Sequence, residues 1–226
     1  MRPAILPGLF VLVVRGAFAQ AQPDVAEVLK KVSETYKGVS EYELVAEATM
    51  TEGGTSTRAH MRVAFRAPDR YRMEATIPGL EPTDSRLDEA VTIHDGSALW
   101  FYLPKSNQYG SIPADELAAD PEGSAHTPEA TDEVMMGLYR RAADLADGAK
   151  LLREEAIDVA GVAVPCYVAS VMDRTWWVDK KTNRVVREDR GGSSTVFTLI
   201  RLGEPLPDSL FKFVPPPGAR KVEFQQ

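Results

Sequence analysis

The chain has 226 residues, of which 44% are hydrophobic and 26% charged, and its formal net charge at pH 7 is −7. An acidic chain is repelled by nucleic-acid phosphates, so nucleic acid is not expected as a partner. Its single cysteine, Cys166, excludes an intramolecular disulfide. We therefore expect one domain that is held together by a hydrophobic core.

The first 19 residues have the features of a cleaved signal peptide. Arg2 gives a weak positive start, residues 4–14 are apolar, and residues 17–19 (Ala-Phe-Ala) fit a cleavage site. Arg15 is unusual inside such a segment, so a membrane-anchored N-terminus stays open as the alternative. Cleavage leaves a single domain over residues 20–226, with 24 basic residues against 33 acidic ones, and 24 − 33 = −9. We expect a periplasmic protein.

Residues 23–37 have the period of an amphipathic helix, after which the pattern changes to the two-residue period of strands. Residues 42–50, 57–66 and 70–77 alternate apolar with polar side chains between turn residues, which predicts an antiparallel meander with one dry and one wet face. The wet face carries glutamates on the first strand and arginines on the next two. We interpret it as cross-strand ion pairing, with a docking surface for an acidic partner as the alternative.

Asp95-Gly96 between two apolar runs predicts a hairpin of strands 91–94 and 98–103. The second strand is apolar on both faces, so we expect both to be covered. Residues 113–128 read as a loop with one helical turn, and Thr131 is expected to cap a helix that runs to Ala146. The apolar side of this helix is expected from Val134, Met135, Leu138, Tyr139, Ala142 and Leu145. Further strands are predicted at 108–112, 151–159, 162–172, 174–178, 184–190 and 195–201, followed by a helical turn at 207–210 and an edge segment at 211–214.

This order of elements predicts an α+β fold. About ten to eleven strands and two helices follow one another without β–α alternation. We expect one large, strongly curved antiparallel sheet, a half-open β-barrel, with helices covering its concave face.

Residues that could carry catalysis or bind a metal are few. His60, His94 and His126 are the only histidines, and none has a partner at a metal-motif spacing. No local signature marks an activated nucleophile, and Cys166 is expected to be a small buried hydrophobe. We predict no enzyme activity, no metal and no cofactor.

Apolar side chains exceed what two helices can cover. A closed core could use them all, or a cavity could lie between sheet and helices with methionines as adaptable walls. The methionines concerned are Met50, Met61, Met73, Met135 and Met136. An acyl chain would suit such a cavity, since burying ~16 carbons at about 0.8 kcal/mol per methylene offers on the order of 10 kcal/mol.

Four motifs resemble the LolA-type family of periplasmic lipoprotein carriers, and they occur in that family's order over nearly the whole chain after residue 19. They are Phe65-x-x-Pro68, Asp95-Gly96-x-x-Leu99-Trp100-Phe101-Tyr102, Trp177-Val178-Asp179 and Phe211-x-Phe213-x-Pro215-Pro216-x-Gly218. The resemblance implies a half-open, eleven-stranded barrel with a helical lid that binds lipid or lipoprotein acyl chains. It implies a role in lipoprotein carriage or outer-membrane sorting, with inner- or outer-membrane proteins as further partners. Candidate cavity residues are then Met61, Phe65, Met73, Trp100, Tyr102, Met135 and Leu138.

One position departs from the family pattern. Carriers of this family have an arginine directly before the strand-turn proline, where it helps to keep the lid closed. Here Ala67 stands before Pro68, and Arg66 comes one residue earlier. A shift of one residue reverses the direction of a strand side chain. A regulatory or sensor module that binds a membrane-anchored protein through the arginine-bearing face is therefore the alternative function.

Overall fold

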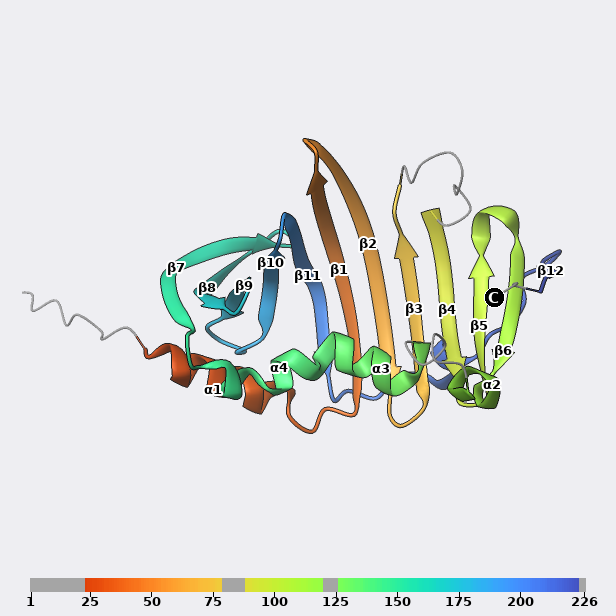
Figure 1. The fold of residues 1–226 in the computed structure, drawn as a ribbon, viewed down its shortest axis with the longest axis horizontal. Helices are drawn as coiled ribbons and strands as arrows, with labels where there is room; N and C mark the ends of the chain where they lie inside the picture. Colours follow the sequence, from red (N-terminus) through yellow and green to blue (C-terminus); the bar gives the residue numbers. More distant parts are fainter. Residues whose placement is uncertain (1–22, 79–87, 120–125, 224–226) are drawn as a thin grey trace, which may run out of the picture.

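The computed structural model describes residues 23–78, 88–119 and 126–223, so the predicted signal peptide lies outside the described residues. Its strands form one sheet of twelve, in the order β12-β6-β5-β4-β3-β2-β1-β11-β10-β9-β8-β7. In Figure 1 these strands lie side by side, with the helices across one end of the sheet. The predicted α+β class, with a large, curved and open sheet, is confirmed.

The strands are β1 (Glu41–Glu52), β2 (Thr55–Arg66), β3 (Arg70–Thr76), β4 (Glu89–Asp95), β5 (Ala98–Leu103), β6 (Gln108–Pro113), β7 (Lys150–Val159), β8 (Val162–Val171), β9 (Arg174–Asp179), β10 (Val185–Arg190), β11 (Ser193–Leu202) and β12 (Arg220–Lys221). All neighbours pair antiparallel except β12, which lies parallel to β6. The predicted edge segment at 211–214 is wrong. The pairing edge comes after the prolines at 215–217, which lack the N–H that a ladder needs.

Helix α1 (Val25–Tyr36) follows its predicted boundaries closely, and the side chain of Asp24 accepts from the backbone N–H of Ala26 at its start. Its apolar stripe is buried at Val28, Leu29, Val32 and Tyr36. The Tyr36 hydroxyl accepts a hydrogen bond from the Val185 N–H at 3.1 Å, which fixes the helix to β10. One face of the sheet packs against α1 and the chain around 126–146. We call it the helix face.

The predicted helix at 131–146 is wrong in its form. The chain instead makes α3 (Pro128–Asp132), a π-helical turn η4 (Glu133–Gly137), α4 (Leu138–Arg140) and a 3-10 turn η5 (Ala142–Leu145). Thr127, not Thr131, caps its start, and Pro128 takes the first helical position, where its missing N–H costs nothing. We call residues 128–145 the cover segment. A further short helix, α2 (Ala114–Ala119), follows β6.

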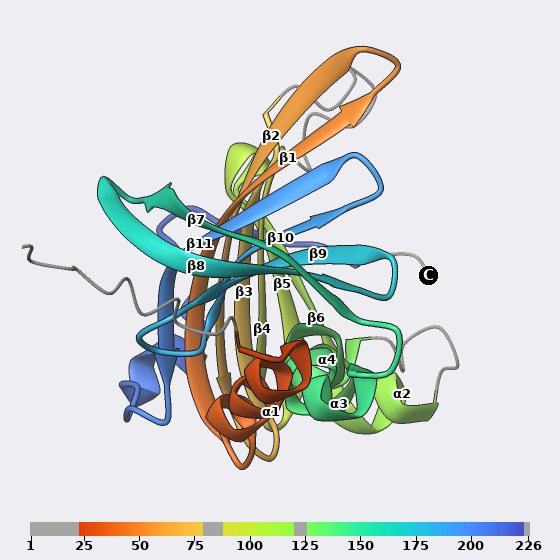
Figure 2. The same cartoon turned by 90° about the vertical axis from the view of Figure 1, so that its left-hand side faces the viewer.

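The opposite face of the sheet is wet only in part: Glu47 and His60 are exposed there, and the predicted cross-strand pairing of glutamate with arginine forms, as between Glu43 and Arg62. The chain from 203 to 216 crosses this face, including the 3-10 turn η6 (Asp208–Phe211), and buries Ala64 with Leu206 and Phe211. In Figure 2 this C-terminal chain, in blue, lies on the other side of the sheet from the helices. Glu43 on this face is only 2% exposed.

The Asp95-Gly96 hairpin forms as predicted, with His94 paired to Leu99 across β4 and β5. Gly96 has φ +94°, and a Cβ there would lie 2.9 Å from Oδ2 of Asp69. Asp95 accepts hydrogen bonds from the N–H groups of Ser97 and Ala98 at 2.8 and 2.9 Å, and from the Trp100 indole at 2.8 Å. The positive φ of Gly96 and the hydrogen bonds that the Asp95 side chain accepts therefore define the turn.

Candidate functional site

A hollow of about 180 Å³ lies on the helix face, between the sheet and the cover segment. Met61 comes to it from the middle of β2, and Met135 and Leu138 come from the π-helical turn and α4. These three side chains are half-buried and pack against the main core, while Val134 beside them is 75% exposed. The full lining is Met61, Val134, Met135, Leu138, Tyr139, Arg174, Glu188, Thr195 and Phe197.

One wall of this hollow is polar, but its polar groups satisfy one another. Glu188 Oε2 accepts from the Trp176 indole at 2.7 Å and from the Tyr139 hydroxyl at 3.2 Å, and Oε1 accepts from Arg174. Burial, with the nearby Glu188 charge, holds the pKa of Tyr139 well above its usual range, so its hydroxyl stays protonated and donates. Since both carboxylate oxygens are occupied, the wall presents no unpaired acidic group to a ligand.

The cover segment is tied together internally, and fastened to α1 and to the loop that follows α1, by a small set of polar contacts, which we call the latch. Arg140 makes a two-point pair with Asp132, and its Nη2 also donates to the Val39 carbonyl at 2.9 Å. Ser33 Oγ of α1 donates to the Arg140 carbonyl at 2.5 Å. Just before the segment, the Tyr71 hydroxyl of β3 donates to the His126 carbonyl at 2.9 Å.

Arg66 takes no part in this latch. Its guanidinium points to the opposite face, where it donates to Glu41 at 2.9 Å and pairs with Asp208 of the C-terminal chain. The one-residue shift before Pro68 therefore has a structural consequence. The arginine holds down the C-terminal chain, and Arg140 within the cover segment fastens the helix side.

The predicted cavity residues fall into three groups. Met61, Met135 and Leu138 meet at the hollow. Phe65 and Met73 are on the same face but belong to the packed core, with Phe65 only 3% exposed and stacked on Tyr42. Trp100 and Tyr102 lie on the opposite face, against Phe213 of the C-terminal chain, at ring-centroid distances of 5.2 and 6.1 Å.

Sequence reasoning missed the polar wall of the hollow. Arg174 is the first residue of β9, and Glu188 is the third residue from the end of β10. The only signal for them is that each carries a charge at a position where the strand alternation points to the dry face. Tyr139 was expected on the apolar side of its helix, and it is buried there.

The described residues offer neither a cluster of metal ligands nor a helix that could span a membrane. Residues 23–78, 88–119 and 126–223 contain no group of three or more His, Cys, Asp or Glu side chains that could hold a metal ion. No helix within these ranges is long and apolar enough to cross a membrane.

No family model matches this chain. A curated relative, an uncharacterized protein of Methanocaldococcus jannaschii, is 22% identical over 224 residues. The match covers 96% of this chain and 59% of the relative, so this chain spans about three fifths of the relative's length.

Solved structures similar to this chain include the lipoprotein LppX of Mycobacterium tuberculosis and a LolA superfamily protein of Nitrosomonas europaea. LppX is 14% identical, with 83% of this chain and 99% of that chain covered and a TM-score of 0.46. The LolA superfamily protein is 16% identical, with 85% and 99% covered and a TM-score of 0.35. At such TM-scores and identities, these structures assign neither a family nor a ligand to this chain.

Proposed function

We propose that this protein is a non-enzymatic binding protein for an acyl chain of a lipid or lipoprotein, which enters between the sheet and the cover segment. The observation that carries the proposal is the hollow, where half-buried apolar side chains of both layers face each other around Met61 and Met135. Methionine side chains are flexible and polarisable, and they adapt to chains of different shape. The proposed setting is the periplasm, reached through the signal peptide expected at residues 1–19.

The polar wall supports an apolar ligand rather than a charged one. Glu188 is neutralised by Arg174 and accepts two further hydrogen bonds. A ligand charge placed there would have to displace partners that are already well matched, at the full cost of leaving them unpaired. A methylene chain needs only the apolar part of the lining.

Binding a whole acyl chain requires the cover segment to move outwards. A volume of about 180 Å³ is below the 300–1,000 Å³ of ordinary ligand pockets. The cover segment is built for such movement, because it is a series of short α, π and 3-10 turns and not one regular helix. Few polar contacts beyond the latch have to break.

The proposal is tested with protein purified without detergent and analysed by native mass spectrometry, followed by titration with a fluorescent fatty acid. We expect a bound acylated molecule at one per chain, or uptake of the added fatty acid by the emptied protein. Met61→Gln places an amide in the hollow and should weaken uptake about tenfold, because the apolar contact of one methionine is lost. Met172→Gln is the matched control, since Met172 is 68% exposed at the β8–β9 turn, outside the lining of the hollow.

A mass without any ligand, together with no uptake of fatty acid or lipopeptide, would contradict the proposal. Equal loss of uptake in the two methionine variants would place the binding site elsewhere. The two methionine variants locate the binding site only if the wild type binds a ligand. The absence of binding and binding at another site are therefore distinguished.

A further inference from the structure

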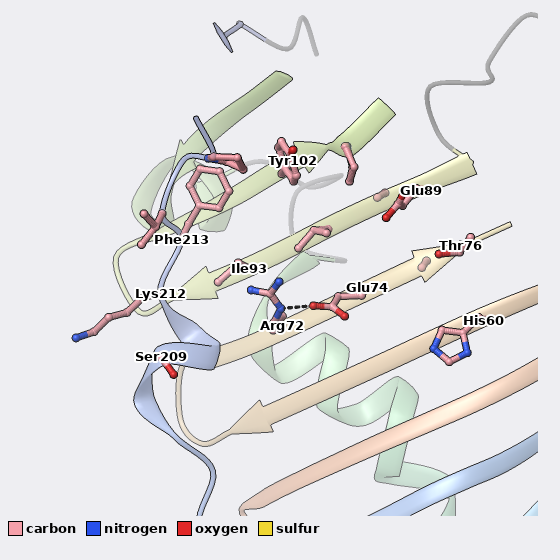
Figure 3. A pocket seen from close by; sticks show the side chains of 16 residues that line it. His60, Arg72, Glu74, Thr76, Glu89, Ile93, Tyr102, Ser209, Lys212 and Phe213 are labelled. Carbon is pink, nitrogen blue, oxygen red and sulfur yellow. Dashed lines mark hydrogen bonds and ion pairs between the residues drawn. The ribbon is translucent and has the colours of Figure 1, made fainter. Parts of the chain in front are cut away.

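A second cavity, of about 590 Å³, lies on the opposite face of the sheet, between β3–β5 and the C-terminal chain. Its floor and one wall are apolar, from Val91, Ile93, Tyr102 and Phe213. Figure 3 shows Arg72 and Glu74 of β3 beside this floor, with Phe213 on the far wall. The volume falls within the range of pockets that hold small organic ligands.

Arg72 is the terminal residue of a row of alternating charges across this face. Glu43 of β1 accepts from Arg201 on one side, at 2.8 Å, and from Arg62 on the other, at 2.8 and 2.5 Å. Nη1 of Arg62 lies 4.0 Å from Oε2 of Glu74, and Oε1 of Glu74 accepts a hydrogen bond from Nε of Arg72 at 2.5 Å. The row contains three arginines and two glutamates, and 3 − 2 leaves one positive charge.

Arg72, one of the two ends of this row, lies at the cavity. Within the described part of the chain, Nη1 and Nη2 of Arg72 make no hydrogen bond, since its one such contact is through Nε. The Arg72 side chain is 24% exposed. In Figure 3 the end of the guanidinium points from β3 toward Ile93 and the C-terminal chain, whereas the Lys212 side chain extends away from the cavity.

We propose that this cavity binds a small apolar carboxylate, whose two oxygens pair with the two Nη groups of Arg72 and whose apolar body lies on Val91, Ile93 and Phe213. A guanidinium holds a carboxylate through two parallel hydrogen bonds, and its geometry selects a planar anion. A fatty acid of medium length and an aromatic acid share this chemistry. The site is distinct from the hollow under the cover segment, because the sheet separates the two.

The other acidic group in the lining is far from the proposed anion. Glu89 stands four residues further along the strands than the Arg72–Ile93 pair, which is about 13 Å at 3.3 Å per residue. A ligand carboxylate at Arg72 therefore meets one paired acid, Glu74, and no second one. Glu89 serves as a control position in the same cavity.

The experiment compares phenylbutyrate with its uncharged amide, phenylbutyramide, and octanoate with octanamide, by calorimetry on the whole protein. Methyl resonances of Val91 and Ile93 are followed in parallel by NMR. We expect the acids to bind at least tenfold more tightly than the amides and to shift these two residues. Arg72→Met should weaken the acids about 10- to 100-fold, Arg72→Lys should restore only part of this, and Glu89→Gln should change affinity less than threefold.

Equal binding of acid and amide would overturn the proposal, as would the absence of binding up to the solubility limit of the acids. Shifts confined to the methyls of Met61 and Met135 would also overturn it, because the ligand would then occupy the hollow on the helix face. The comparison of acid with amide uses the unmodified protein, so the result stands even if Arg72→Met does not fold.

Discussion

The latch offers a sharp test, because two neighbouring arginines in the cover segment make ion pairs of very different burial. The side chains of Arg140 and Asp132 are 25% and 18% exposed, whereas those of Arg141 and Glu133 are 55% and 54% exposed. Arg140→Met removes a two-point pair and the bond to the Val39 carbonyl. A hydrogen bond to a charged group contributes about 1.5–3 kcal/mol, and since these contacts share one side chain we expect a loss of about 2–3 kcal/mol.

Arg141→Met should cost only about 0–1 kcal/mol, as exposed pairs do. Hydrogen exchange of the backbone amides in residues 128–145 measures the difference. A loss of 2–3 kcal/mol corresponds to exchange that is about 30- to 150-fold faster in Arg140→Met, with the strands unchanged. Equal exchange in the two variants would refute the latch, and faster exchange across the whole sheet would mean that Arg140 stabilises the entire fold.

Three further predictions concern single side chains. Cys166 is fully buried, and burial raises the pKa of its thiol to about 12, so a thiol reagent at pH 8 should modify it only at the rate of unfolding, measured by absorbance with and without urea. Burial opposes ionisation of Asp95, but its hydrogen bonds from Ser97 and Trp100 outweigh that and lower its pKa. The ionised Asp95 therefore stabilises the fold above its unfolded pKa of about 3.9, and this stabilisation is lost as the pH falls through its lower folded pKa. In urea titrations, the difference in unfolding free energy between the wild type and Asp95→Asn should shrink below about pH 4. Glu43→Ala should destabilise by about 1–3 kcal/mol in urea unfolding, against less than 1 kcal/mol for the exposed Glu47→Ala, because two arginines lose a buried partner.

Much of the sheet could be predicted because strand alternation is a strictly local signal. The predicted strand 98–103 has the boundaries of β5, and 151–159 differs from β7 by one residue. The cover segment could not be predicted in the same way, because a π-helical turn changes the residue spacing from one apolar contact to the next. Val134 was expected on the apolar side and is 75% exposed, while Met136 is fully buried.

The position of the C-terminal chain was the larger feature that the sequence did not predict. This segment covers part of the opposite face of the sheet. Its residues between 203 and 216 have no regular period that would pair them with a strand. Nothing local therefore indicates that Leu206 and Phe211 cover Ala64, or that Arg66 pairs with Asp208. The expectation of a wet face follows from alternation and holds around Glu47 and His60, but it fails under the C-terminal chain, because cover from a distant segment is a tertiary effect.

The placement of Trp100 shows why register limits the prediction of a site. The pairs Phe65–Tyr71, Tyr71–His94 and His94–Leu99 carry one face of the sheet from β2 to β5, so Leu99 shares the face of Phe65. Trp100, one residue on, must then lie on the other face. The sequence cannot supply this chain of pairs, because the connection between β3 and β4 is long and a slip of one residue there exchanges the two faces. β5 is apolar on both faces, so the alternation of polar and apolar side chains does not show which face is buried. The side of the sheet on which Trp100 lies therefore depends on strand pairing, which only the folded sheet provides.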